Sequence, residues 1–293
     1  MKKTLFIYNS KSGKGISQHK IYYIIRQLCN KYPSIIICPT FEYGDAYNFT
    51  TRYIASVDKI IVMGGDGTIN DVVSAIAKSN YSPTLAIIPN GTMNDLAHNL
   101  HLPTRYRSAL NIAMSDNSAY VPILKVNDTY ATYGIAVGRF ANTSYTTKQS
   151  VKKHFGKISY FFNAIKELFG YKSINANILI EDQIIEDNFS LLLLSTSNII
   201  AGFQFTCNNS KTSAIFIKEP KRLKNITSFL RIAKLFVFDK KYINNDKQLG
   251  VYDFNSIQIN FNAKQEIIID GNKYIADKLD ISVLQDRIRI CSQ

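Results

Sequence analysis

The sequence predicts an α/β plus β protein: a doubly wound parallel α/β domain followed by a mainly antiparallel β domain, read as a β-sandwich. Two observations support this. Up to about residue 120, short apolar runs alternate with segments of helical periodicity, as in sheets built from βαβ units. After Pro122 the pattern changes to strand-like stretches separated by polar turns. We therefore expect domains at residues 1–121 and 122–293, with the last residues able to pack back on the first domain.

The N-terminal half contains apolar, β-branched runs of strand length and segments in which apolar residues recur at helical spacing. We expect strands at residues 4–8, 35–38, 59–63 and 84–88. We expect helices at residues 17–31, 46–56, 69–79, 93–100 and 105–115. In the first helix, Ile21, Ile24 and Leu28 fall on one face, which predicts that this face packs on the sheet.

The C-terminal half contains strand-like stretches at residues 129–137, 174–181, 184–196 and 249–291. Two segments of helical period, residues 152–171 and 221–241, interrupt them. We expect both helices to pack on the β domain. The second is rich in lysine and arginine, so it can also lie on an anionic lipid surface.

Composition indicates a globular protein. The chain has 293 residues, of which 46% are hydrophobic and 19% charged, so it can bury a sizeable core. No apolar run reaches the roughly 18–20 residues of a membrane-spanning helix. The N-terminus has a basic start, but the apolar stretch that follows is too short for a signal peptide. The four cysteines lack metal-site spacing. We therefore expect a cytoplasmic protein with reduced thiols.

The positive charge narrows the class of partners. The formal net charge is +13. Such a charge attracts nucleic acid, anionic membranes or phosphorylated ligands. We expect no nucleic-acid partner, because the sequence shows no zinc-finger spacing, no RNA-recognition aromatic motif and no basic region with heptads. An anionic membrane surface fits better, and an AT-rich coding sequence is the alternative origin of the lysines.

Residues 60–71 (IIVMGGDGTIND) are the most informative segment. An apolar strand ends in Gly64 and Gly65, which lack a Cβ and let the backbone approach a ligand closely. A helix that begins near Thr68 directs unpaired N–H groups and its positive dipole end at the same place, which suits phosphate. Asp66 lies between them. Its carboxylate suits a cation or a reacting hydroxyl, and the alternative is an ordinary helix cap.

Two further strand–turn–helix segments repeat the pattern. In residues 84–100, an apolar strand runs into Gly91 and Thr92. In residues 4–15, a strand runs into the loop NSKSGKG, which lacks Walker A spacing but still suits phosphate. The carboxyl ends of parallel strands meet at one edge of a sheet, so we expect the three turns to converge on one site.

Four motifs together resemble those of a known family. They are Asn9-x-x-Ser12-Gly13, Gly44-Asp45-Ala46, Gly64-Gly65-Asp66-Gly67-Thr68 and Pro89-x-Gly91-Thr92-x-Asn94-Asp95. Over nearly its whole length, the chain resembles the bacterial lipid kinases related to diacylglycerol kinase, which share their fold with NAD kinases. The Gly-Gly-Asp-Gly-Thr motif also occurs in NAD kinases, whereas the Pro-x-Gly-Thr-x-Asn-Asp motif favours the lipid-kinase branch.

The resemblance implies an ATP site in a cleft between the two domains, with Mg²⁺ as the cation. Asp66 and Asp95 would hold the metal directly or through water, and Asp66 is also implied in catalysis. The implied nucleotide-binding residues are Asn9, Ser10, Lys11, Ser12, Gly13, Thr40, Gly64, Gly65, Asp66, Gly67, Thr68, Asn70, Asp71, Gly91, Thr92 and Asn94.

The resemblance also implies a catalytic role for Asp270. This residue occupies the first position of the family's Asp-Gly-Glu turn, where a carboxylate can accept the proton of a lipid hydroxyl. Taken without the resemblance, Asp270-Gly271 is typical of a β-hairpin turn, and that structural reading stays open.

The sequence departs from the family pattern at three places. The glutamate of the late turn is Asn272 here, which cannot act as a base. The aspartate that usually follows the domain crossover is absent, since residues 122–125 read PILK, with Leu124 in place of an acid. The Asn-Asp-Gly loop that can hold a structural Mg²⁺ is replaced by residues 206–211.

We therefore expect an ATP-dependent lipid kinase that phosphorylates a hydroxyl of a membrane lipid, with diacylglycerol as the default acceptor. The three departures leave a catalytically impaired nucleotide- or lipid-binding regulator as the alternative, and NAD kinase is the less favoured enzyme. We expect the protein to act at the inner face of the membrane as a peripheral protein. The oligomeric state stays open, with a homodimer as one option.

Overall fold

The computed structural model describes residues 3–13, 15–138, 173–196, 199–200, 203–204, 212–219 and 249–292. The helices expected at residues 152–171 and 221–241, and the loop at residues 206–211, lie outside the described residues. By its internal contacts the chain divides into two units: residues 1–123 with 284–293 form unit 1, and residues 124–283 form unit 2. Within the described ranges, no helix is both long enough and apolar enough to cross a bilayer.

Unit 1 alternates strands and helices along the chain. Its strands are β1 (Lys3–Asn9), β2 (Ser34–Thr40), β3 (Lys59–Gly64) and β4 (Thr84–Pro89). Its helices are α1 (Gln18–Lys31), α2 (Asp45–Tyr53), the 3-10 turn η1 (Ile54–Ser56), α3 (Asp66–Lys78), α4 (Asp95–Asn99) and α5 (Tyr106–Ala113). Two long strands, β5 (Ser118–Val126) and β15 (Asn272–Cys291), carry the chain from one unit to the other.

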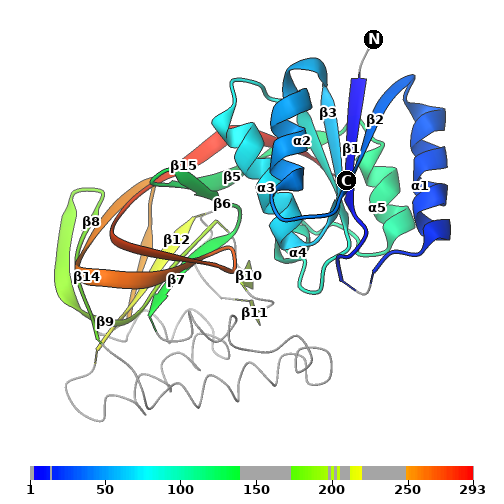
Figure 1. The fold of residues 1–293 in the computed structure, drawn as a ribbon. Coiled ribbons are helices and arrows are strands. Elements are labelled where there is room, and N and C mark those ends of the chain that lie inside the picture. Colours follow the sequence, from blue (N-terminus) through cyan, green and yellow to red (C-terminus); the bar gives the residue numbers. More distant parts are fainter. Residues whose placement is uncertain are drawn as a thin grey trace. The chain divides into compact units, whose positions relative to one another are not determined.

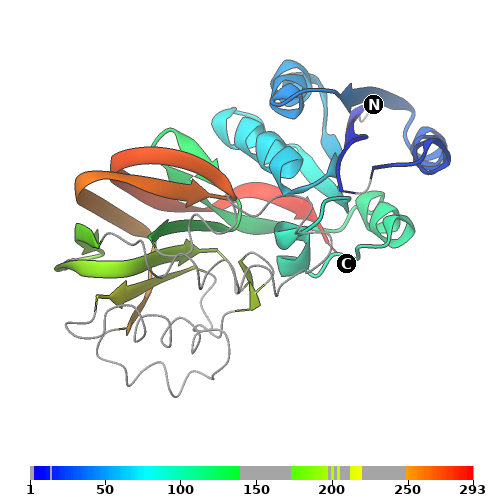
Figure 2. The same cartoon turned by 60° about the horizontal axis from the view of Figure 1, so that its bottom comes forward.

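A parallel sheet in the order β4–β3–β1–β2 forms the centre of unit 1. Every residue of β3 and β4 is buried, as expected for central parallel strands that are covered on both faces. Helices α1 and α5 cover one face, and α2 and α3 cover the other (Figure 1 and Figure 2). This arrangement confirms the predicted doubly wound α/β fold.

The C-terminal end of β15 belongs to unit 1. Ile290 pairs with Leu85 of β4 in parallel register, which adds this segment to the sheet. Arg287 donates hydrogen bonds to the carbonyls of Ile76, Ala77 and Ser79 at the end of α3. A cation at this place also interacts favourably with the negative end of the helix dipole. The last turn of α3 is therefore held by one residue, Arg287, about 210 positions later in the chain.

Unit 2 is built from antiparallel strands. They are β6 (Thr129–Ala131), β7 (Gly134–Gly138), β8 (Ile174–Ile180), β9 (Gln183–Ser195), β10 (Ile199–Ile200), β11 (Phe203–Gln204), β12 (Ser213–Lys218), β13 (Leu249–Asp253) and β14 (Ser256–Ile269). The antiparallel β domain is thus confirmed. The pairing closes a ring, because β9 and β14 each pair with both β7 and β8. Apart from β10 and β11, which pair with each other in a separate sheet, the described strands therefore enclose their core within one strongly bent sheet.

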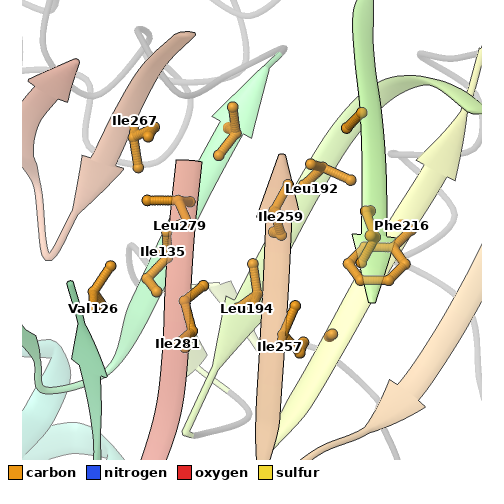
Figure 3. Close-up of a cluster of buried hydrophobic side chains, with 14 of the residues drawn as sticks. Val126, Ile135, Leu192, Leu194, Phe216, Ile257, Ile259, Ile267, Leu279 and Ile281 are labelled. Carbon is orange, nitrogen blue, oxygen red and sulfur yellow. The ribbon is translucent and has the colours of Figure 1, made fainter. Parts of the chain in front are cut away.

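Strict alternation of apolar residues creates the core of unit 2. In β14, Ile257, Ile259 and Phe261 are buried while the residues between them are exposed, so one face of the strand points inward. The inward side chains of several strands meet in a single cluster (Figure 3). β14 changes its register against β15 between Asn260 and Gln265, and there it passes from β8 to β7 as neighbour. Such a bulge lets a strand bend sharply.

Several elements differ from the sequence prediction. The helix expected at residues 93–100 is shorter, because Asn94 adopts a left-handed conformation (φ 53°) and the helix starts only at Asp95. β5 was not predicted, because Pro122 lies inside this strand although proline cannot donate to a ladder. β12 was also missed. The stretch expected at residues 129–137 is two strands, β6 and β7, separated by Thr132 and Tyr133.

Candidate active site

The structure brings the three glycine-containing turns of unit 1 together at the carboxyl edge of the parallel sheet. These turns follow β1 (residues 9–13), β3 (residues 64–68) and β4 (residues 89–95). β3 lies between β1 and β4 and pairs with both in parallel register. The turns also contact one another through backbone and side-chain groups. The convergence expected from the sequence is therefore present within this unit.

Two glycines allow the turns after β3 and β4 to touch through their backbones. A Cβ atom on Gly91 would lie 2.6 Å from the Cα atom of Gly65 and 2.8 Å from Oδ1 of Asn94. Contacts this short cannot be relieved, because one of the neighbours is backbone. Asn94 completes the turn, since its Oδ1 accepts from Gly91 N–H at 2.7 Å and its Nδ2 donates to the Gly91 carbonyl at 3.1 Å. Asn94 thus fixes the turn for which the family resemblance implies nucleotide binding.

The loop after β1 is ordered by its own polar side chains. Asn9 donates through Nδ2 to Oγ1 of Thr68 at 3.3 Å and accepts at Oδ1 from Lys11 N–H at 2.9 Å. Ser12 donates through Oγ to the Asn9 carbonyl at 3.0 Å. Gly13 has φ 61°, and a Cβ atom there would lie 2.4 Å from the carbonyl oxygen of Asn90. Only glycine fits this position, because both its conformation and its closeness to another backbone exclude a side chain.

Asp66 connects the turn after β3 with the helix after β4. It is the first residue of α3, whose N-cap is Gly65. Oδ2 of Asp66 accepts the N–H of Asn94 at 2.9 Å, at the start of α4. Burial raises the pKa of Asp66, and the backbone N–H groups of Asn94, Asp95, Leu96 and Asp66 itself oppose this shift. Asp66 therefore joins the start of its own helix to the start of α4.

The second carboxylate oxygen of Asp66 is well suited to a cation. Oδ1 is buried and has no hydrogen-bond partner among the described residues. Such an orphaned anionic oxygen is costly unless a cation or water approaches it. Asp95, in the first turn of α4, is the second acid of the site and is only 2% exposed. The described ranges contain no cluster of three or more metal-ligating side chains, and Asp66 and Asp95 are the two carboxylates of this site that could hold a hard cation.

The remaining predicted nucleotide-binding residues of unit 1 lie around the three turns and Asp66. Thr40, at the end of β2, is buried and lies beside Asn9 in the sheet register. Asn70 and Asp71 follow in α3 and are half-buried. Lys11, Gly67 and Thr92 are exposed at the same edge, and Ser10 is half-buried. The structure thus groups all predicted nucleotide-binding residues at one edge of the sheet, and their role in nucleotide binding stays a prediction.

Burial at Asp71 has a measurable consequence for stability. It raises the pKa of this carboxyl from 3.8 to about 6. A raised folded-state pKa favours the protonated form, so this contribution to stability is complete below pH 3.8 and is lost as the pH rises through about 6. We expect Asp71→Asn to melt a few degrees above the wild type at pH 7.5, with the difference vanishing towards pH 4. Calorimetry at both pH values checks this, and an equal difference at both would contradict it.

In unit 2, Asp270 lies at the turn between β14 and β15 and is almost completely buried (6% exposed). Oδ1 accepts the N–H groups of Tyr133 at 3.1 Å and Gly134 at 3.0 Å. Oδ2 accepts the N–H of Thr132 and, at 2.7 Å, the Oγ1–H of the same residue. Burial raises the pKa of Asp270, and these four donors oppose the shift.

The turn at Asp270 is a tight hairpin. Asp270 and Gly271 both have positive φ, at 46° and 81°, as in a two-residue turn of the Asp-Gly type. The hairpin reading of this motif is therefore present in the structure. A catalytic role for Asp270 stays a prediction, because a carboxylate has about four lone-pair positions and four donors occupy them here.

Two of the three departures from the family pattern lie within the described residues. Leu124 is fully buried in the core cluster of unit 2 and pairs with Ala131 of β6, so an apolar side chain replaces the acid there. Asn272 follows the Asp270 turn and pairs with Ile269. The altered loop at residues 206–211 lies outside the described residues.

Two residues of the site were not found from the sequence. Asn90 bonds to the loop after β1, and Lys20 bonds to Asn90 across 70 positions of sequence. Asn90 occupies the variable position of the Pro89-x-Gly91 motif, which is the one signal that could have drawn attention to it. Lys20 carries no such signal, because a polar residue in the first turn of a helix is ordinary.

Comparisons with known proteins agree with this geometry. The family model of the diacylglycerol kinase catalytic domain matches residues 3–126. A diacylglycerol kinase of Staphylococcus carnosus is 30% identical over 204 residues, which cover 69% of this chain and 67% of that protein. A diacylglycerol kinase of Staphylococcus saprophyticus is 28% identical over 279 residues, 92% of each chain. The fold is similar to that of a diacylglycerol kinase from Bacillus anthracis (TM-score 0.77, 22% identity), with 100% of this chain and 97% of that chain covered.

Proposed function

This chain belongs to the diacylglycerol kinase family, and we propose that it transfers the γ-phosphate of ATP to a hydroxyl of a membrane lipid, with diacylglycerol as the default acceptor. The observation that carries this proposal is the meeting of three glycine turns around the buried carboxylate of Asp66. Gly67 leaves open space in the first turn of α3, where backbone N–H groups suit a phosphate. Asp66 presents an unpaired oxygen to a cation at the same place.

Phosphoryl transfer depends mainly on positioning and on neutralising the phosphate charge. We assign Mg²⁺ to Oδ1 of Asp66, with Asp95 as a second ligand directly or through water. When bound, the ion would neutralise the charge that develops on the transferred phosphate. The chain's own contribution is to hold Asp66 in place through the Asn94 N–H and to hold the loop after β1 through Asn9 and Asn90.

We assign the proton-accepting role to Asp270, as the family pattern implies. Three of its four donors are backbone N–H groups and are fixed by the fold. The fourth is the hydroxyl of Thr132, which can rotate away and free one lone pair of Oδ2. A lipid hydroxyl could then donate to that position. Burial, which raises the pKa of Asp270, makes the carboxylate a stronger base than an exposed aspartate.

In this proposal each unit binds a different substrate. Unit 1 holds the nucleotide, as its glycine turns suggest, and unit 2 binds the lipid acceptor. The net charge of +13 supports peripheral binding to an anionic membrane at its inner face. Salt-sensitive sedimentation with phosphatidylglycerol vesicles, but not with neutral ones, is the result that agrees with this. Light scattering would decide whether the protein is a homodimer.

An acceptor screen tests the reaction directly. Purified protein is incubated with γ-labelled ATP and Mg²⁺ in the presence of diacylglycerol, phosphatidylglycerol, sphingoid bases or NAD. We expect label in phosphatidic acid and none in NADP. NADP as the sole product would replace the proposal by NAD kinase. ATP binding by calorimetry without turnover on any acceptor would instead identify a regulator that has lost catalysis.

A further inference from the structure

Lys20 lies at the same edge of unit 1 as the glycine turns, although neither the sequence motifs nor the proposed reaction include it. It belongs to the first turn of α1, after the N-cap Ser17. Its Nζ donates to Oδ1 of Asn90 at 2.9 Å and lies 4.9 Å from the centre of the Tyr106 ring. Lys20 is half-buried, and its contacts with Asn90 and Tyr106 hold its ammonium at a defined position.

Asn90 connects all three turns of the site. Its backbone N–H donates to the carbonyl of Gly64 at 2.8 Å, which fixes it against the turn after β3. Its Nδ2 donates to the carbonyl oxygen of Ser12 at 3.0 Å and to Oγ of Ser12 at 2.9 Å, which fixes the loop after β1. Its Oδ1 is left to face Lys20. The orientation of the Asn90 amide, and with it the place of the Lys20 ammonium, is therefore set by the turns themselves.

The ammonium of Lys20 is incompletely satisfied. An ammonium has three N–H donors, and among the described residues only Asn90 accepts from it. No carboxylate in the described ranges forms an ion pair with it. Burial lowers the pKa of Lys20, while the neighbouring Tyr106 opposes the shift. A lysine that serves only to keep a helix surface hydrated would extend into solvent, as Lys31 at the other end of α1 does.

We propose that Lys20 binds the phosphate chain of the nucleotide, and that Asn90 is the positioning residue that directs its ammonium there. The inference rests on the proposed nucleotide site and names a further residue of it. An oxyanion would supply the missing acceptors and the opposite charge. A P-loop lysine performs a comparable role as a point charge. Here the lysine would come from the first turn of a helix and would be aimed by an asparagine of a neighbouring turn.

The proposal is tested by measuring how nucleotide affinity depends on the charge at residue 20 and on the number of phosphates in the ligand. Lys20→Met keeps the apolar stem over Tyr106 and removes the charge, Lys20→Arg keeps the charge, and Lys31→Met is the matched control on the same helix. Adenosine, ADP and ATP compete with a fluorescent ATP analogue for the full-length protein. Because a charge-assisted hydrogen bond is lost, we expect Lys20→Met to weaken the binding of ADP and ATP about 10- to 100-fold. The affinity for adenosine should change less than about threefold. Lys20→Arg should bind ADP and ATP with most of the wild-type affinity, and Lys31→Met should match the wild type.

The outcomes separate the inference from the function on which it rests. Equal weakening of adenosine and ATP in Lys20→Met would show that Lys20 only supports the fold, and would overturn the inference. Unchanged ATP affinity in this variant would overturn it as well, while leaving the proposed kinase intact. A wild-type protein that binds none of the three ligands would refute the nucleotide site itself, and with it the role of Lys20.

Discussion

Replacing Asp66 by asparagine is expected to lower phosphotransferase activity by about 10³-fold while changing the melting temperature by no more than a few degrees. The two parts of this expectation follow from the two oxygens of the carboxylate. Oδ2 accepts the Asn94 N–H at 2.9 Å, and the amide oxygen of asparagine can accept the same bond. Oδ1 has no partner among the described residues, so an amide NH₂ there displaces no existing hydrogen bond.

The activity falls because the charge is lost. A hard cation is held by anionic oxygen, and a neutral amide binds Mg²⁺ far more weakly. There is a further reason why the stability of the fold should not fall in Asp66→Asn. Burial raises the pKa of Asp66, so the folded protein gains rather than loses when this charge is removed in the absence of metal. Substrate turnover and thermal unfolding of the same preparations, with and without Mg²⁺, measure the two effects separately.

A matched control removes a carboxylate from elsewhere in unit 1. Asp116, in the exposed segment after α5, is suitable because it lies outside the candidate site. Asp116→Asn should keep wild-type turnover. If Asp66→Asn kept more than about a tenth of the wild-type activity, the metal site would lie elsewhere and Asp66 would serve only to cap α4.

Local rules were sufficient to predict most of unit 1. The apolar runs of β3 and β4 and the one-sided pattern of α1 each specify an element without help from the rest of the chain. The errors arise where tertiary contacts override local signals. The side chain of Asn94 hydrogen-bonds both the N–H and the carbonyl of Gly91, and its backbone takes a left-handed conformation. The helix α4 therefore starts only at Asp95, later than expected from local signals. Pro122 is tolerated inside β5 although its residue type argues against a strand.

The candidate site was predictable in its glycines but not in its polar network. Both Gly13 and Gly91 lie too close to another backbone for a side chain, and Gly13 also has a positive φ, so both positions require glycine. The hydrogen bond from Asn94 to Asp66 spans 28 positions, and that from Lys20 to Asn90 spans 70. Such pairs depend on how the turns meet in space. Spacing along the chain carries no information about them, and a single sequence cannot reveal them.

The late Asp-Gly turn illustrates a further limit of the sequence. The motif alone supports either a hairpin or a catalytic carboxylate. The structure shows the hairpin, and the catalytic role is what our proposal adds. Asp270 forms the turn and at the same time presents its carboxylate to the backbone of residues 132–134. Two roles for one residue can be separated only by an experiment that measures stability and turnover independently.

Replacing Asp270 by asparagine is expected to destabilise the fold by about 3 kcal/mol or more, in contrast to the same change at Asp66. Both carboxylate oxygens of Asp270 accept backbone N–H groups, so the NH₂ of asparagine faces a donor in either orientation. At least one buried N–H then loses its acceptor. Urea unfolding followed by circular dichroism measures this loss, and an unchanged unfolding free energy would contradict the hydrogen-bond arrangement around the turn.

Turnover of the folded Asp270→Asn variant decides the catalytic role. Since a positioned base typically contributes about 10²–10⁴-fold, we expect a loss of at least about 10²-fold after correction for the folded fraction. Thr132→Val is the companion variant, because it removes the one donor to Asp270 that can rotate and leaves the three backbone N–H groups in place. It should keep most of the activity. If the activity of Asp270→Asn instead followed the folded fraction alone, Asp270 would be a structural carboxylate and the proton acceptor would have to be another group.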